Sequence, residues 1–315
     1  MDRSIIISNG RCGSTLLSDL IVDEPETCSV QEFFTSLEPW PHGPAQLTGA
    51  AYWSVLSSPK VELAILHRLG VPPKEVRYPA DGRWAQDLGS LPRVLAVTLS
   101  KLTDDPDTLY AQLADRVPHF PRQSTAAHHQ AFLDLCATLL GRKRWVERSG
   151  GSTQWAAALL ADHPTAKFVY LTRNWPDTAK SMSRHASFQL GQVRTEVQAR
   201  YGVDPFDLPP GQAVPAEVEP YLPDRLTLDM LRERGADLRR YLGLCAFLTS
   251  QAEQAISDNP PRRFLRMRYE DLLADPVREL TALGEFLDFA DPAGWAETVA
   301  PRVGRPERTA VAAAN

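Results

Sequence analysis

The chain has 315 residues, 43% of them hydrophobic and 23% charged, and this ordinary globular composition excludes disordered and fibrous proteins. Its length suits one large α/β domain or two small ones. The formal net charge of −5 argues against a general nucleic-acid coat, which would need a clustered basic excess, but it allows a local pocket for an anion.

In the first part of the chain, the pattern predicts a buried strand at residues 4–9, a glycine-bearing turn and a helix at residues 14–21. A second strand is expected over residues 27–34, running into a loop. Prolines and glycines interrupt residues 35–125 so often that only short helices and loops are expected there. The clearest of these short helices cover residues 61–69 and 107–116.

In the remainder of the chain, strands and helices alternate. The expected helices cover residues 127–141, 153–161, 176–190, 224–257 and 276–287. The expected strands cover residues 144–148, 167–172 and 263–269. Residues 203–223 are rich in proline and acid and are expected to form a loop or lid, and Gly235 is expected to break the long helix. This alternation predicts an α/β fold with a parallel sheet flanked by helices.

The cysteines and the apolar segments bear on the compartment. Four cysteines are widely spaced and form no CxxC pair, so neither a zinc site nor a disulfide framework is expected. The chain opens with only three consecutive apolar residues, and no window approaches the roughly 18 that a membrane span needs. We therefore expect a cytoplasmic protein without membrane or nucleic-acid partners.

The most informative segment is IIISNGRCGSTLL, residues 5–17. A buried strand ends in a glycine turn that opens a helix, and free backbone N–H groups at a helix start attract anions. Arg11, Ser14 and Thr15 can add charge and hydroxyl donors. An ordinary turn with a serine cap is the plainer interpretation. The segment lacks the lysine of a Walker A motif, and no acidic residue ends a suitable strand, which disfavours a magnesium-dependent kinase.

This segment resembles the 5′-phosphosulfate loop of sulfotransferases that use 3′-phosphoadenosine 5′-phosphosulfate (PAPS), which usually reads R/K-S/A-G-S/T-S/T. The resemblance implies that the 5′-phosphosulfate is surrounded by Arg11, Cys12, Gly13, Ser14 and Thr15. Cys12 stands where serine is common, so the contact there would depend on the backbone N–H. The implied fold is a P-loop-NTPase-like central parallel sheet with a largely helical acceptor-binding insertion or lid.

A second anchor is the segment FVYLTRNWPDTAKS, residues 168–181. An arginine follows a buried strand, and a serine lies eight residues later in a helix. Taken alone, this pattern is best interpreted as a surface arginine and a solvated serine. It is similar to the sulfotransferase 3′-phosphate motif, which implies that Arg173 and Ser181 hold the 3′-phosphate of PAPS without a metal. Asn174 and Trp175 depart from the Asp-Pro common in that family.

A third segment, RYEDLLADP at residues 268–276, resembles a family sequence that we interpret as structural, tying a strand end to the next helix. The resemblance therefore covers the start, centre and end of the chain. It implies one sulfotransferase domain over residues 1–315, in which residues 35–125 and 190–260 build the acceptor site and lid. The aromatic residues expected in that site include Trp40, Tyr52, Trp53 and Tyr201.

Sulfuryl transfer needs a general base for the acceptor hydroxyl and cations on the leaving side. Our candidate base is Glu32, which ends the second expected strand beside the phosphate loop. Its segment, SVQEFF, is similar to the corresponding part of the bacterial trehalose sulfotransferase, and the tyrosylprotein enzymes also place a glutamate base shortly after the loop. A solvated strand-end acid is the alternative interpretation.

Arg148, in the segment WVERS, is the second catalytic candidate beside Arg11, because a similar family stretch places a lysine near the transferred group. An arginine would stabilise charge there, and a structural ion pair with Glu147 or another acid is equally compatible. Arg305, in the basic tail segment, could close over the nucleotide or simply be solvated. Of the histidines at positions 42, 128, 129 and 185, the last is retained because it follows the 3′-phosphate helix.

The sequence thus predicts a PAPS-dependent sulfotransferase of the bacterial small-molecule type, which transfers a sulfuryl group to a hydroxyl and releases 3′-phosphoadenosine 5′-phosphate (PAP). The acceptor could be a carbohydrate, a lipid or another secondary metabolite. A magnesium-dependent P-loop kinase and a non-catalytic nucleotide-binding protein remain alternatives. The oligomeric state is open.

Overall fold

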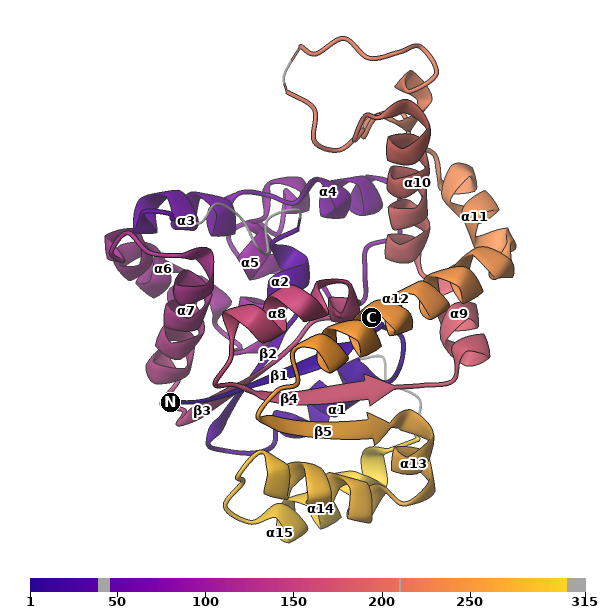
Figure 1. Ribbon diagram of the computed structural model, residues 1–315. Coiled ribbons are helices and arrows are strands. Elements are labelled where there is room, and N and C mark those ends of the chain that lie inside the picture. Colours follow the sequence, from indigo (N-terminus) through magenta and orange to yellow (C-terminus); the bar gives the residue numbers. More distant parts are fainter. Residues whose placement is uncertain (39–45, 210, 305–315) are drawn as a thin grey trace, which may run out of the picture.

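The computed structural model describes residues 1–38, 46–209 and 211–304. Within them the strands form one parallel sheet in the order β2-β3-β1-β4-β5. Their bounds are β1 Asp2–Ser8, β2 Thr27–Gln31, β3 Arg144–Arg148, β4 Lys167–Thr172 and β5 Arg263–Arg268. The predicted fold class, a P-loop-like parallel sheet flanked by helices, is confirmed (Figure 1).

Helices follow most strands and cover both faces of the sheet. Their bounds are α1 Ser14–Ile21, α2 Phe33–Ser36, α3 Gly49–Ser57, α4 Val61–Arg68, α5 Arg93–Ala96, α6 Pro106–Arg116, α7 Thr125–Leu139, α8 Ala156–Asp162, α9 Trp175–Ser183, α10 Ala186–Tyr201, α11 Leu228–Ala236, α12 Leu238–Asp258, α13 Tyr269–Ala274, α14 Pro276–Phe286 and α15 Pro292–Val299. Short 3₁₀ helices cover Leu88–Ser90, Leu99–Lys101, Val117–His119, Ser152–Trp155, Glu219–Tyr221 and Ala300–Arg302. No helix of the described segments is long and apolar enough to span a membrane.

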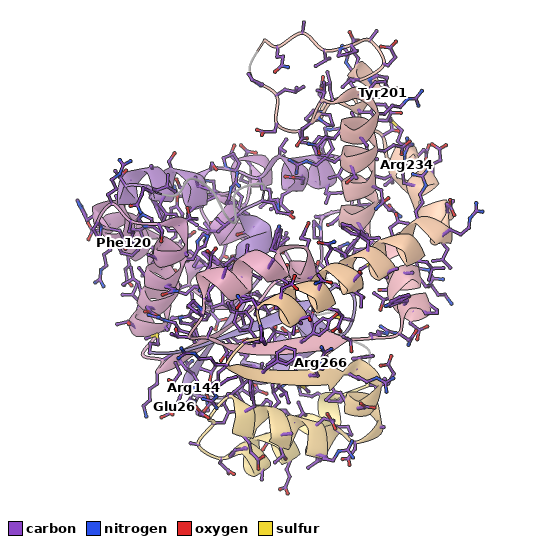
Figure 2. The ribbon with its side chains drawn as sticks, viewed as in Figure 1. Glu26, Phe120, Arg144, Tyr201, Arg234 and Arg266 are labelled. Atoms are coloured by element: carbon purple, nitrogen blue, oxygen red, sulfur yellow. The ribbon has the colours of Figure 1, made fainter. Side chains whose placement is uncertain are left out.

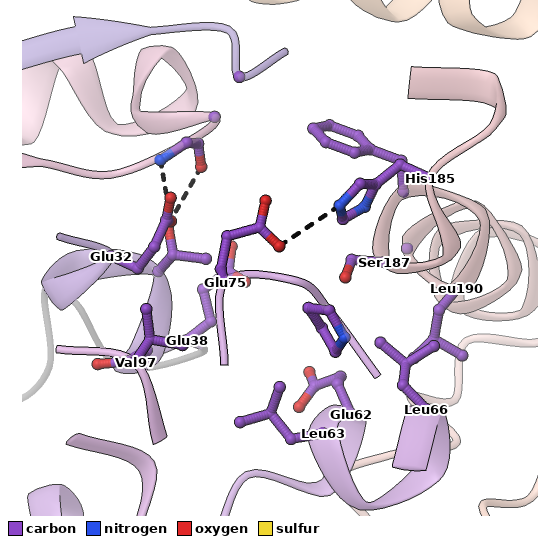
Figure 3. Close-up of a pocket in the computed structure, with 18 of the residues that line it drawn as sticks. Glu32, Glu38, Glu62, Leu63, Leu66, Glu75, Val97, His185, Ser187 and Leu190 are labelled. Carbon is purple, nitrogen blue, oxygen red and sulfur yellow. Dashed lines mark hydrogen bonds and ion pairs between the residues drawn. The ribbon is translucent and has the colours of Figure 1, made fainter. Parts of the chain in front are cut away.

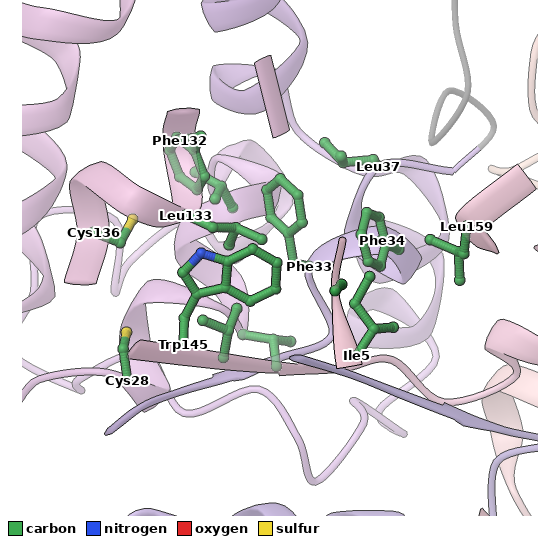
Figure 4. Packing of buried hydrophobic residues seen from close by; sticks show 14 of the residues in the cluster. Ile5, Cys28, Phe33, Phe34, Leu37, Phe132, Leu133, Cys136, Trp145 and Leu159 are labelled. Carbon is green, nitrogen blue, oxygen red and sulfur yellow. The ribbon is translucent and has the colours of Figure 1, made fainter. Parts of the chain in front are cut away.

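The central strand β1 is buried on both faces, and its isoleucines alternate between two cores. Ile5 and Ile7 point into the larger core, which contains Trp145 and α7 residues such as Phe132 (Figure 4). Ile6 points into the opposite core, against residues of α1, α14 and α15. Because β1 lies in the middle, the loop that follows it leaves the sheet at its centre.

A third apolar cluster lies beside the sheet and joins α4, α10, α11 and the segment after α10. It includes Leu66, Leu190, Phe206 and Leu231. Figure 1 shows α10 and α11 standing to one side of the sheet, connected to it through α9 and α12. This largely helical part comes mostly from the two segments expected as insertions.

Ion pairs stabilise the sheet outside the candidate site. Arg144, at the start of β3, lies 3.2 Å from Glu24 and 3.4 Å from Glu26, and Figure 2 shows Arg144 and Glu26 close together. Arg266, in the middle of β5, pairs with Glu253 of α12 at 2.6 Å.

Among the differences from the predicted element boundaries, three concern β2, the helix after β4 and the long helix. The strand expected to reach residue 34 ends at Gln31, because Glu32 has a positive φ of 56° and Phe33 already begins a helix. The helix expected over residues 176–190 is two helices, α9 and α10, separated at Arg184 and His185. The long helix breaks at Asp237, two residues after Gly235.

Candidate active site

Three loops meet at the carboxyl end of the sheet. β1 pairs with β3 on one side and with β4 on the other. The strand order reverses at β1, because β3 lies on one side of it and β4 on the other. Open α/β sheets bind ligands in the crevice outside such a topological switch point. The loops after Ser8, Arg148 and Thr172 are therefore the positions at which a site is expected, and all three carry candidate residues.

The loop after β1 has an unusual backbone. Gly10, Arg11 and Gly13 all have positive φ, at 76°, 55° and 89°. For Arg11 this left-handed conformation is unfavourable, and such strain gathers at functional sites. Among the described residues, no side chain makes a capping hydrogen bond at the start of α1, and a helix start of this kind favours an anion.

Tyr269, the first residue of α13, fixes the position of this loop. A Cβ added to Gly13 would lie only 2.2 Å from Cδ2 of the Tyr269 ring. The same ring makes a cation–π contact with the guanidinium of Arg173, whose Cζ lies 4.8 Å from the ring centroid. The loop and the candidate 3′-phosphate arginine are thus positioned by the same tyrosine.

We predict that Gly13→Ala weakens the binding of PAP at least tenfold and lowers the thermal midpoint, because the ring must shift and φ is positive. Calorimetry and thermal unfolding measure the two effects. Gly243→Ala in α12 is the matched control, since nothing lies within 4 Å of its Cβ position and alanine favours a helix by up to about 1 kcal/mol. Equal behaviour of the two variants would show that Gly13 needs no close packing.

Arg11 joins the two predicted anion motifs. Its Nε donates to Oγ of Ser181 at 3.2 Å, and its backbone carbonyl accepts from NH1 of Arg173 at 3.4 Å. A second guanidinium nitrogen, NH1, lies 3.2 Å from Oε1 of Glu75. Residues about 160 positions apart in the chain therefore share one site, as the resemblance implied.

Arg173 has spare hydrogen-bonding capacity. Its Nε is buried and has no hydrogen-bond partner among the described residues. Its NH2 lies 3.6 Å from Asp177 in α9, and that carboxylate is itself exposed. A buried N–H donor without a partner is costly in a finished structure. This side chain is therefore suited to a ligand that supplies acceptor oxygens.

A cavity of about 680 Å³ lies around Arg11, Arg173 and Ser181, and we call it the basic cavity. Its described lining includes the basic residues Arg11, Lys74, Arg77, Lys101, Arg173, Lys180 and Arg184, against the acids Glu75 and Asp177. In a protein with a net charge of −5, this local excess of positive charge is selective for anions.

A second cavity of about 440 Å³, the mixed cavity, adjoins the first. Arg11, Thr15, Pro73, Glu75 and His185 line both cavities. Most of the other lining residues of the mixed cavity come from residues 35–125 and 190–260. Figure 3 shows Glu32, Glu38 and Val97 on one side of it, His185, Ser187 and Leu190 on the other, and Glu75 between them.

Glu32 lies in the mixed cavity, with 14% of its side chain exposed. Its Oε1 accepts a hydrogen bond from NH1 of Arg148, and its Oε2 accepts one from the N–H of Gly150 at 3.0 Å. We expected Glu32 to end a strand beside the phosphate loop. Glu32 instead follows β2, and β3 lies between β2 and β1. The tight turn after Gln31 instead brings Glu32 onto the end of β3.

Arg148 is 1% exposed and has a fixed orientation. Besides Glu32, it donates from Nε to Ser18 at 2.9 Å and from NH2 to Gln31 at 2.8 Å. The ion-pair partner is therefore Glu32 rather than the neighbouring Glu147. The positive charge of Arg148 stands beside the carboxylate that we consider as the base.

Glu147 is fully buried, and desolvation raises its pKa to about 8, although a hydrogen bond from Ser149 at 2.6 Å opposes this shift. A carboxyl group with a raised pKa in the folded state destabilises folding increasingly as pH rises from its unfolded pKa to its folded pKa. We therefore predict that the free energy of unfolding falls between pH 5 and pH 8, and that Glu147→Gln removes this part of the decrease. Chemical denaturation at both pH values tests this, and an identical decrease in the variant would contradict it.

Of the remaining candidates, two line a cavity, one has its side chain in the core, and one lies outside the described residues. Ser14 and Thr15 line the mixed cavity, and Thr15 also lines the basic one. The Cys12 side chain points into the core, with Sγ 3.7 Å from the Leu171 carbonyl, and burial raises its thiol pKa. Only its backbone can therefore contribute to the loop. Arg305 lies outside the described residues.

Several expected acceptor-site residues lie elsewhere. Tyr52 is buried in the large core, Trp53 packs against that core, and Tyr201 packs against the helical cluster. None of these three lines either cavity. Trp40 and His42 fall outside the described residues. Buried His128 stacks on Tyr52 at 4.6 Å, and buried His129 accepts from or donates to the same hydroxyl at 2.9 Å.

Glu75 and Lys60 carried too little sequence signal to be recognised as site residues, because they lie in the irregular segment between residues 35 and 125. Glu270 was expected to have a structural role, joining its own strand to α13. Glu270 instead accepts from the N–H and the side-chain amide of Asn174, both at 2.9 Å, and so fixes the turn after β4. Within the described residues, no group of three or more His, Cys, Asp or Glu could hold a metal ion.

No known family model matches this chain, and no curated protein matches it. Two similar solved structures are the sulfotransferase domain from the curacin biosynthetic pathway and sulfotransferase STF9 from Mycobacterium avium. The first is 16% identical, with a TM-score of 0.42 over 91% of this chain and 74% of that one. The second is 15% identical, with a TM-score of 0.45 over 96% and 69%. At these values the comparisons carry no argument about activity, which must come from this chain's residues.

Proposed function

We propose that this protein is a PAPS-dependent sulfotransferase that acts on a hydroxyl of a small molecule. The observation that carries the proposal is the convergence of Arg11, Arg173, Ser181 and Thr15, in the first turn of α1, on the basic cavity. A carboxylate, Glu32, stands in the adjoining cavity. One cavity is thus suited to an anionic donor and the other to an acceptor.

The residues fit a donor with phosphate groups at both ends of its ribose. The unpartnered Nε of Arg173 and the hydroxyl of Ser181 are suited to the 3′-phosphate. The backbone of residues 10–14 and the hydroxyls of Ser14 and Thr15 are suited to the 5′-phosphosulfate. This many basic groups can balance the charge without a metal.

Bound PAPS supplies a sulfuryl group: the S–O bond to the 5′-phosphate breaks, its electron pair leaves with the phosphate, and a new O–S bond forms to the acceptor oxygen. Glu32 accepts the acceptor proton. Two of the roughly four lone-pair positions of its carboxylate are used by Arg148 and Gly150. Those two contacts fix its orientation, and the remaining positions can receive the hydroxyl.

Arg11 and Arg148 supply positive charge on the two sides of the reacting groups. Arg11 lines both cavities and is placed to stabilise negative charge on the leaving side. Arg148 holds Glu32 in position through a buried ion pair. An arginine remains charged at any physiological pH, so neither side chain takes up the proton.

We also propose that the acceptor-binding part of this single domain comes from residues 35–125 and 190–260. The mixed cavity has the volume of a small-molecule site. One wall carries apolar side chains such as Leu66, Leu190 and Phe206, while Glu38 and Gln154 line a polar part. A carbohydrate, a lipid or another secondary metabolite would each present a hydroxyl to such a mixed lining.

The experiment is an acceptor screen with sulfur-35 PAPS in the presence of a metal chelator. Pools of sugars, lipids and phenolic or aliphatic alcohols are incubated with the protein, and labelled organic sulfate is separated from the donor. We expect labelled product from at least one pool. Label transfer only from γ-phosphate-labelled ATP with magnesium would instead support a kinase, and PAP binding without transfer to any pool would support a non-catalytic protein.

A further inference from the structure

Glu75 lies at the boundary between the two cavities and belongs to none of the recognised motifs. It is carried by the irregular segment between α4 and the 3₁₀ helix Leu88–Ser90. Its side chain is 17% exposed, although it is charged and points towards the loop after β1. Figure 3 shows it in the middle of the mixed cavity, turned towards His185.

Glu75 makes two ionic contacts. Its Oε1 lies 3.2 Å from NH1 of Arg11, and its Oε2 lies 3.7 Å from Nε2 of His185. Burial alone would raise the pKa of this carboxyl, but its interactions with His185 and with the charge of Arg11 lower the pKa to about 2. The group therefore keeps its negative charge at every pH at which the protein would act.

Arg11 cannot serve Glu75 and an incoming anion equally well. In the free protein its guanidinium is divided between Ser181, at Nε, and Glu75, at NH1. A 5′ anion would compete with Glu75 for NH1 of Arg11, whereas the hydroxyl of Ser181 can donate to a 3′-phosphate while it still accepts from Arg11. A carboxylate left beside the donor would also repel it.

The segment around Glu75 is held by few backbone hydrogen bonds. Val76 N–H donates to Pro73 at 3.1 Å, and Arg77 N–H donates to Ala96 at 3.4 Å. His185 is fixed at the junction of α9 and α10, and its buried Nδ1 has no partner among the described residues. The imidazole of His185, whose Nε2 already lies 3.7 Å from Oε2 of Glu75, is thus a second partner for Glu75 once Arg11 is withdrawn.

We infer that Glu75 is a built-in anion that occupies the donor's place on Arg11 and is displaced towards His185 when the donor binds. This inference rests on the proposed function. Because Glu75 also lines the mixed cavity, its displacement changes the passage between the two cavities.

The first test compares Glu75→Gln with the wild type by calorimetric titration with PAP. Glutamine has the same shape without the charge, so we expect PAP to bind at least about fivefold more tightly, a change within the usual range of coupling between sites. The matched control is Glu253→Gln, which removes a carboxylate from the ion pair with Arg266, outside both cavities. Unchanged or weaker PAP binding by Glu75→Gln would overturn the inference.

The second test uses the wild-type protein, since loss of a buried ion pair could impair folding of the variant. Hydrogen exchange is followed by mass spectrometry with and without PAP. We expect slower exchange in residues 9–15 and faster exchange in residues 72–79. Slower or equal exchange in residues 72–79 while PAP is bound would contradict a displacement of Glu75.

A parallel titration with pyrophosphate separates failure of this inference from failure of the proposed function. If the wild type binds no PAP but Glu75→Gln binds pyrophosphate at least about fivefold more tightly than the wild type does, Glu75 competes with anions and the donor was misassigned. If PAP binds the wild type but neither ligand gains affinity in the variant, the donor site stands and the role of Glu75 falls.

Discussion

Glu32→Gln is expected to lower kcat by about 10²- to 10⁴-fold, the usual contribution of a general base, while PAP binding changes less than about twofold. Glutamine keeps the shape of the side chain, and its amide oxygen can still accept from Arg148, whereas its NH2 group cannot accept from the N–H of Gly150. It cannot take the acceptor proton. Steady-state kinetics with the acceptor found by the screen, together with PAP calorimetry, measure both quantities.

The matched control for this prediction is Glu38→Gln. Glu38 lines the same cavity and pairs with Lys60 at 3.5 Å and with Gln154 at 3.1 Å, but it belongs to no predicted catalytic motif. We expect its kcat to fall less than about tenfold, below the range for a general base. A Glu32→Gln variant with nearly full kcat would show that another group, with His185 as the first candidate, takes the proton.

Arg148→Met is expected to lower the free energy of unfolding by about 3–5 kcal/mol, the usual loss when one member of a buried ion pair is removed. Glu32 would lose its cationic partner and retain only the N–H of Gly150, while Ser18 and Gln31 would lose their donor. Denaturant unfolding monitored by tryptophan fluorescence measures the change. We expect the loss of unfolding free energy in the double variant, Glu32→Gln with Arg148→Met, to be smaller than the sum of the losses in the two single variants.

The control for Arg148 is Arg266→Met. Arg266 also pairs with a glutamate, at 2.6 Å, but about half of its side chain is exposed. Exposed pairs contribute about 0–1 kcal/mol, so the stability of this variant should change little. Equal losses in the two variants would mean that burial of the Arg148 pair has no special energetic effect.

The sequence predicted the sheet and the strand–loop–helix connections that we propose as anion sites, because the signals for these elements are local. Three isoleucines followed by a glycine turn and hydroxyl residues specify a strand, a turn and a helix over 18 consecutive residues. Arg173 and Ser181 likewise lie on one strand–helix connection. Their contact with Arg11 follows from the adjacency of β1 and β4 in the sheet, which the structure shows.

Glu32 was placed in the correct region for an incomplete reason. The sequence does not reveal that β3 separates β2 from β1, nor that Glu32 adopts a left-handed backbone conformation. Its contact with Arg148 depends on the parallel register in which Gln31 lies opposite Arg148. A strand order is decided by packing across the whole sheet, which no single segment encodes.

Glu75 and the acceptor-site aromatics could not be predicted, because their surroundings come from distant parts of the chain. The segment around Glu75 has neither helical nor strand periodicity, and its partners Arg11 and His185 lie 64 and 110 positions away. Tyr52 and Trp53 were expected to line a pocket, but α3 turns them towards the core. Aromatic composition alone does not distinguish a core from a binding site.

The most direct test of the central claim is calorimetric titration with PAP, without magnesium, of the wild type, Arg173→Ala and the matched control Arg266→Ala. The account predicts micromolar binding by the wild type, weak binding of ATP, a loss of at least about 30-fold in Arg173→Ala, as for a charge-assisted phosphate contact, and no change in the control. Absence of PAP binding, equal binding by Arg173→Ala, or tight ATP binding that requires magnesium would contradict the assignment of the basic cavity to PAPS.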